Sequence, residues 1–245
     1  MLAIFKREFK SYFSTPVGFI VLAAYYFFLG LYFEMVFSYG SPEVNYVILA
    51  MNNVVVFTTP IITMKLMSDD RRQKVDQALL TAPVKLTSIV MGKFLAAFAL
   101  FALGFAPTIV FEIIVASYVA TSLFSFFYAL LGILLLGAAL IAIGMFVSSL
   151  TESPAVSAML SLVVNILVLY MSGITSLISG SSTTTEIGTF IVELLAKITE
   201  KVAFISVVQN FADPVLSIVD IIYFLTIIAA FLFLSVRSLE KRRWA

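Results

Sequence analysis

The sequence predicts an all-α polytopic membrane protein with six transmembrane helices, and three observations lead to that class. The chain has 245 residues, of which 62% are hydrophobic and only 12% are charged, and its mean hydropathy is +1.10. A soluble domain cannot bury so much apolar surface. The apolar runs are continuous, without the alternation of a β-barrel strand, and at about 20 residues each can cross a hydrocarbon core.

Composition and motifs also exclude several kinds of chemistry. The sequence contains no cysteine and no histidine, which rules out disulfides, histidine-based triads and histidine metal sites. Gly92 and Lys93 are followed by Phe94 and lack the upstream glycine of a phosphate-binding loop. We therefore expect no catalysis, no metal and no cofactor in this chain. A net charge of +1 argues neither for nor against an acidic partner, and no nucleic-acid partner is expected.

The first element is a short amphipathic segment, Met1–Thr15, which Pro16 ends. Apolar residues recur in it at helical spacing, with basic residues between them. Two interpretations fit this pattern: a helix that lies on an anionic membrane surface, or a basic flank that sets the topology. The apolar run that follows is too long for the core of a signal peptide, so we expect a retained first span.

Six apolar segments follow, and each is long enough to cross a core about 30 Å thick. We place the spans at approximately Val17–Phe37, Tyr46–Met67, Phe94–Tyr118, Leu123–Val147, Ala155–Ile178 and Ile218–Val236. The whole chain, 1–245, is expected to form a single transmembrane domain. Span four is rich in small residues, including Gly132, Gly137 and Gly144, which favour close helix contacts either within the subunit or across a dimer.

Basic residues indicate the topology. All but two of the 15 lysines and arginines precede span one, flank the loop between spans two and three, or follow span six. By the positive-inside rule, both termini and the segment Ser68–Lys93 are expected to be cytoplasmic. The loop between spans four and five, Ser148–Pro154, contains no basic residue, and its side follows only from the number of spans.

Three acidic residues lie inside the apolar runs. Glu34, Glu112 and Asp220 would each rise about 24–27 Å from the cytoplasmic side, at 1.5 Å per helical residue. The simpler interpretation is that they are interfacial acids that reach water. The alternative is an acidic collar around an exit path at the outer edge of the membrane.

An external element, 179–215, is expected before span six. Ser179–Glu186 reads as a polar loop, and Ile187–Val202 carries apolar residues at helical spacing with a charged opposite face. The apolar stretch Val202–Val215 contains an Asp213-Pro214 break, which is compatible with a re-entrant hairpin shielded by protein. The element therefore combines an amphipathic helix with a re-entrant segment.

The long charged segment between spans two and three is the most informative part of the sequence. Ser68 or Asp69 can cap a helix, with the acids at its positive end, and Pro83 would end it. We expect the coupling segment, 68–86, to contain a short, rigid helix that lies parallel to the membrane and joins the two spans. The alternative is a solvated loop that only sets the topology.

The stretch from Met67 through Phe94 resembles the cytoplasmic coupling segment of type-2 ABC transporter permeases, especially the gliding-motility-like branch. The matching residues are Asp69-Asp70-Arg71-Arg72, Leu79-Leu80, Thr81-Ala82-Pro83-Val84 and Gly92-Lys93-Phe94. The sequence departs from the family at Lys74-Val75-Asp76-Gln77, where Gly-Thr-x-Glu is usual. Further similarity lies at the end of span four, in Ser148-Ser149-Leu150-Thr151, and in the N-terminal segment.

The resemblance implies the permease subunit of an ATP-driven exporter in a bacterial-type plasma membrane. Two such subunits, identical or related, would pair, and each would bind a separate ABC ATPase that holds the ATP and Mg²⁺. The residues implied to contact the ATPase are Asp69, Asp70, Arg71, Arg72, Leu79, Leu80, Thr81 and Pro83. Two alternatives stay open: a membrane anchor for a motility or envelope complex, and an ion-coupled transporter using Glu112 or Asp220.

Overall fold

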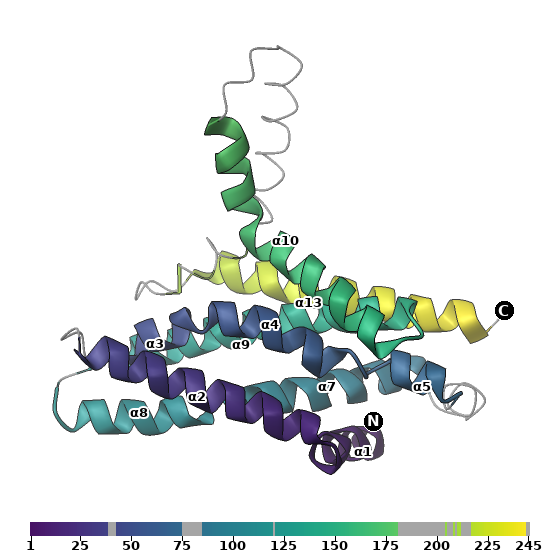
Figure 1. The fold of residues 1–245 in the computed structure, drawn as a ribbon, viewed down its shortest axis with the longest axis horizontal. Coiled ribbons are helices and arrows are strands. Elements are labelled where there is room, and N and C mark those ends of the chain that lie inside the picture. Colours follow the sequence, from purple (N-terminus) through teal and green to yellow (C-terminus); the bar gives the residue numbers. More distant parts are fainter. Residues whose placement is uncertain are drawn as a thin grey trace.

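The structure is a computed structural model that describes residues 1–38, 43–74, 85–119, 121–180, 204, 208, 210–211 and 217–243. Of residues 170–180, 242 and 243 it describes the backbone only. The regular secondary structure of the described residues is helical throughout. Figure 1 shows most of the helices lying side by side along the long axis of the molecule.

Apolar composition and length make several of these helices candidate membrane spans. The helices are α1 (Leu2–Ser14), α2 (Pro16–Ser38), α3 (Val44–Ala50), α4 (Asn52–Thr63), α5 (Ser68–Arg72), α7 (Leu86–Gly104), α8 (Ala106–Ala116), α9 (Leu123–Leu150), α10 (Pro154–Gly180) and α13 (Ile218–Arg243). Among the described residues, four helical stretches can cross a membrane: Pro16–Ser38, Leu86–Ala116, Leu123–Leu150 and Ile218–Lys241. The pair Val44–Ala50 and Asn52–Arg72, bent by 48°, makes a fifth if it counts as one span.

The chain is thus an integral multi-pass membrane protein with four or five candidate spans in its described part. The predicted fifth span, Ala155–Ile178, falls on α10, whose described apolar part, Pro154–Leu169, is shorter than a full crossing. Six spans therefore remain a prediction. Most of the predicted external element 179–215, and the residues Leu79, Leu80, Thr81 and Pro83, lie outside the described residues.

Helix α9 lies at the centre of the bundle and packs against α3, α4, α7, α10 and α13. Its glycines allow this close packing, because an added Cβ at Gly137 would collide with Phe101 of α7, and one at Gly144 with Thr63 of α4. These glycines therefore serve helix contacts within the subunit, an outcome that the sequence could not separate from a dimer contact.

A proline interrupts the span formed by α7 and α8. Pro107 has no N–H to donate to the carbonyl of Leu103, four residues earlier. The hydroxyl of Tyr26, on α2, donates a hydrogen bond of 3.3 Å to that carbonyl. Phe105 separates α7 from α8 close to this proline, and the two helices together still make one candidate span, Leu86–Ala116.

Pro60 has the same effect inside α4, where it frees the carbonyl of Val56. The side-chain amide of Asn165, on α10, donates to this carbonyl at 3.5 Å and to the Thr59 hydroxyl at 2.9 Å. In hydrocarbon a freed carbonyl must find a donor within the protein. Both proline sites are therefore also contacts between helices.

One end of the bundle gathers the elements that the sequence predicts to be cytoplasmic. Figure 1 shows α1, α5 and the C-terminal end of α13 together at this end. Arg71, on α5, forms an ion pair with Glu152, which follows α9. The connection from α9 to α10 therefore lies beside α5, a placement that counting basic residues could not provide.

Candidate coupling site

Helix α5 is the part of the predicted coupling segment that the structure describes. Asp69 and Asp70 lie in its first turn and Arg71 and Arg72 in its last, the arrangement that the helix dipole favours. The expected cap is wrong, because Met67 holds the N-cap position and makes no side-chain cap. Ser68 is instead the first helical residue, and its hydroxyl donates to the Met64 carbonyl in the preceding turn.

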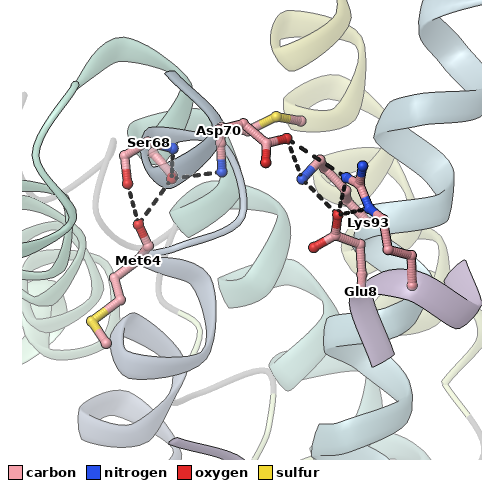
Figure 2. A network of polar contacts seen from close by, with 8 residues as sticks. Glu8, Met64, Ser68, Asp70 and Lys93 are labelled. Atoms are coloured by element: carbon pink, nitrogen blue, oxygen red, sulfur yellow. Dashed lines mark hydrogen bonds and ion pairs between the residues drawn. The ribbon is translucent and has the colours of Figure 1, made fainter. Parts of the chain in front are cut away.

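A buried lysine connects α5 to two other helices. Lys93 lies on α7 and is only 1% exposed. Its Nζ is 2.7 Å from Asp70 Oδ2 on α5 and 3.0 Å from Glu8 Oε1 on α1. Figure 2 shows Lys93 close to both carboxylates. An unpaired ammonium at this depth would cost several kcal/mol, so the two carboxylates are what make its burial tolerable.

Arg7 completes a four-charge cluster that consists of Arg7, Glu8, Asp70 and Lys93. Its Nη2 donates to Glu8 Oε1 at 2.5 Å and lies 3.9 Å from Asp70 Oδ2. Burial alone would raise the pKa of Glu8, but the charge of Lys93 and the hydrogen bonds from Arg7 and Lys93 outweigh it and lower that pKa. The cluster thus holds two positive and two negative charges and is neutral overall.

A serine on the central helix holds the start of α5. Ser148 Oγ, on α9, accepts hydrogen bonds from the backbone N–H groups of Met67, at 3.2 Å, and Ser68, at 3.1 Å. It also lies 3.3 Å from the Met64 carbonyl, to which its hydroxyl donates. Figure 2 shows these contacts around Ser68 and Met64. The first N–H groups of a helix have no partner within it, so Ser148 caps α5 from another helix.

The four described residues with a predicted ATPase contact differ in exposure. The carboxylate of Asp70 is engaged inside the protein by Lys93, and Arg71 is paired with Glu152. Arg72 is 63% exposed on the outer side of α5 and forms an ion pair of 3.1 Å with Asp69, which is only 24% exposed. One face of α5 is thus fixed to the bundle, and the other is open to a partner.

A cleft of about 380 Å³ opens beside the cluster, between α1, α4 and α5. Tyr12, Lys65, Asp69 and Gln73 line it together with residues of the cluster. The Tyr12 hydroxyl donates to the carbonyl of Ile62, which fixes α1 against α4. This recess has both polar and apolar walls and lies next to the predicted ATPase contact. Nowhere in the described part of the chain do three acidic side chains gather as a metal site would require.

The three predicted collar acids have different surroundings. Glu34 is exposed on α2 and accepts from Ser38 at 2.9 Å. Glu112, on α8, is 3% exposed, and one of its carboxylate oxygens has no hydrogen-bond partner. Asp220 accepts from Asn210 at 3.1 Å. Within the described residues no hydrogen bond or ion pair joins the three acids, and the collar stays a prediction.

The sequence did not identify Glu8, Lys93 and Ser148 as members of one site. The sequence did contain a sign that Lys93 is buried, because it lies between apolar residues within a helical run. A lone cation in such a run normally has a partner in the fold. Its partners are 85 residues away at Glu8 and 23 residues away at Asp70, which no local pattern could indicate.

The chain was also compared with known protein families. Residues 1–180 match the family model described as ABC-2 type transporter, which covers α1 to α10, and therefore the cluster and Ser148. A search of curated proteins found no match.

Proposed function

The chain belongs to the ABC-2 type transporter family, and from this premise we propose that it is an exporter permease driven through α5 by a separate ABC ATPase. Membership makes the chain the permease component of an ABC transporter, with an ABC ATPase and the membrane as its partners. The observation that carries the proposal is the buried contact of Asp70, on α5, with Lys93 on α7.

The cluster supports a rigid connection between α5 and the bundle. Separating one partner from a buried ion pair costs about 3–5 kcal/mol, whereas an exposed pair contributes about 0–1 kcal/mol. A push on α5 would therefore move α7 and α1 with it and would not slide past them. Ser148, on the central helix α9, also holds the start of α5, so a displacement of α5 would act on α9 as well. In this proposal ATP-driven closure of the ATPases displaces 69–83, and the spans change from inward-facing to outward-facing.

The proposed assembly contains two permease subunits, identical or related, each bound to one ATPase in a bacterial-type plasma membrane. Both termini and α5 would face the cytoplasm, which the grouping of α1, α5 and the end of α13 at one end of the bundle supports. The gliding-motility-like branch is part of this proposal. The family does not specify the cargo.

A substitution in the segment after α5 tests ATPase docking. Leu79→Asp is expected to abolish co-purification of the ATPase while the permease still inserts into the membrane, because a charge at an apolar contact is costly to bury. Leu79→Met, which keeps the size and apolar character, is the matched control and should retain the ATPase. Stoichiometric ATPase bound to Leu79→Asp would contradict the docking assignment.

A second variant separates docking from transmission of movement. Lys93→Met leaves the outer face of α5 unchanged, so the ATPase should still co-purify. The rate of ATP hydrolysis in the reconstituted complex should then no longer depend on the permease that is bound, because α5 is no longer held to α7. Unchanged coupling in this variant would exclude the cluster as the transmitting contact.

A further inference from the structure

A groove of about 600 Å³ runs between the C-terminal half of α13 and the start of α7. Its walls are almost entirely apolar, and α13 contributes Leu225, Ile228, Ala229, Leu232, Phe233 and Val236. Their spacing of three to four residues places them along one side of the helix. Both helices belong to candidate spans, and Leu225 and Phe233 are more than half exposed, so the groove opens toward the bilayer.

The dimensions of the groove suit one narrow chain. From Leu225 to Glu240 its wall extends about 22 Å at 1.5 Å per residue, which is roughly three quarters of a hydrocarbon core about 30 Å thick. Its volume lies within the range of about 300–1,000 Å³ that is typical of small-molecule pockets.

A cation lies at the polar end of the groove. Arg237 is 63% exposed, and its guanidinium lies 5.1 Å from the centre of the Phe233 ring while it donates to Glu240 at 2.8 Å. These two contacts hold the guanidinium at the rim of the groove. Lys241 follows one turn later and is exposed, so among the described side chains at this end of α13 the cations Arg237 and Lys241 outnumber the acid Glu240.

We propose that the groove binds an acyl chain of an anionic phospholipid, with the lipid phosphate at Arg237. An apolar slot that opens to the bilayer suits the chain, and the net positive rim suits the phosphate. Arginine is well matched to phosphate because its guanidinium donates several hydrogen bonds in one plane. The lipid belongs to the leaflet on the side of the two chain termini. This site is separate from the cluster at α5 and does not depend on the ATPase.

Photolabelling of the full-length permease tests the site. The protein is reconstituted in vesicles of phosphatidylethanolamine and phosphatidylglycerol that contain a trace of phosphatidylglycerol with a photoreactive acyl chain. Labelling should concentrate on 225–236 and on Thr87–Met91. Ala229→Trp fills the groove and should remove most of this labelling. Ala230→Trp is the matched control, because Ala230 is also exposed but is not part of the groove wall.

Arg237→Gln tests the headgroup without filling the groove. Labelling by the anionic probe should fall about fivefold, the factor that corresponds to about 1 kcal/mol for one cation near an anionic surface. Labelling by a matching phosphatidylethanolamine probe should change little. A loss that is equal for both probes would overturn the preference of this site for an anionic headgroup, and unchanged labelling by both probes would overturn the assignment of the phosphate to Arg237.

Two results would overturn the groove itself. The first is equal labelling of wild type and Ala229→Trp. The second is dissociation of a permease dimer in Ala229→Trp but not in Ala230→Trp, which would make the groove a contact between subunits. Size-exclusion chromatography of both variants before reconstitution confirms that each is folded and reports its oligomeric state.

Discussion

Lys93 and Asp70 form an ion pair of 2.7 Å between α7 and α5, with the ammonium almost completely buried. Because Lys93 also contacts Glu8 at 3.0 Å, the same ammonium joins the N-terminal helix to the coupling helix. The physical consequence is that α1, α5 and α7 are held together through one buried ammonium, which has no access to water as an alternative partner.

Removal of the buried ammonium should destabilise the protein strongly. We expect Lys93→Met to lower the free energy of unfolding by about 3–5 kcal/mol, because Asp70 and Glu8 are left without their common partner. Thermal unfolding in detergent measures the loss. Arg72→Met is the control, since its exposed pair with Asp69 is worth about 0–1 kcal/mol. Equal effects of the two substitutions would contradict the assignment of a buried cluster.

The cluster also predicts a dependence of stability on pH. The folded protein lowers the pKa of Glu8 below its ordinary value of 4.5, so the ionised carboxylate is favoured in the folded state. Its contribution is complete above the unfolded pKa and is lost as the pH falls through the folded pKa. The difference in melting temperature between wild type and Glu8→Gln should therefore be constant at neutral pH and shrink below about pH 4.5. A difference that grows on acidification would contradict the direction of the shift.

The central helix should not tolerate a larger residue at Gly144. Gly144→Ala places a methyl group against Thr63, and we expect it to destabilise the protein by about 1–3 kcal/mol through overpacking. Gly30→Ala is the matched control, because nothing lies within 4 Å of its added Cβ. In the control the better helix propensity of alanine should leave stability unchanged or raise it by up to about 1 kcal/mol. Melting temperatures of the two variants decide the comparison.

Asn165 and Pro60 should be energetically coupled. Asn165→Ala removes the donor to the Val56 carbonyl and is expected to cost about 1–2 kcal/mol. Pro60→Ala restores a backbone N–H that can donate to the same carbonyl, so Asn165→Ala should cost less in that background. A double-mutant cycle on the free energy of unfolding should give an interaction of at least about 0.5 kcal/mol. Strictly additive effects would show that the amide does not replace the missing hydrogen bond.

The sequence was a good guide to individual helices. The predicted spans Leu123–Val147 and Ile218–Val236 begin at the same residues as α9 and α13, and Met1–Thr15 corresponds to α1. These features depend on hydropathy and helical periodicity, and both can be read from residues that are close together in the sequence. The predicted cap at Ser68 failed because the Met64 carbonyl, exposed by the turn after α4, takes the serine hydroxyl.

By itself the sequence determined that this chain is a membrane protein and resembles a type-2 ABC permease, because hydrophobic runs and short motifs are local properties. Only the tertiary structure decided that Glu8, Asp70 and Lys93 meet, that Ser148 caps α5, and that Asn165 reaches the carbonyl freed by Pro60. Each of these contacts satisfies a buried charge or polar group with a partner on another helix. The choice of partner depends on how the helices pack, and no window of neighbouring residues contains that information.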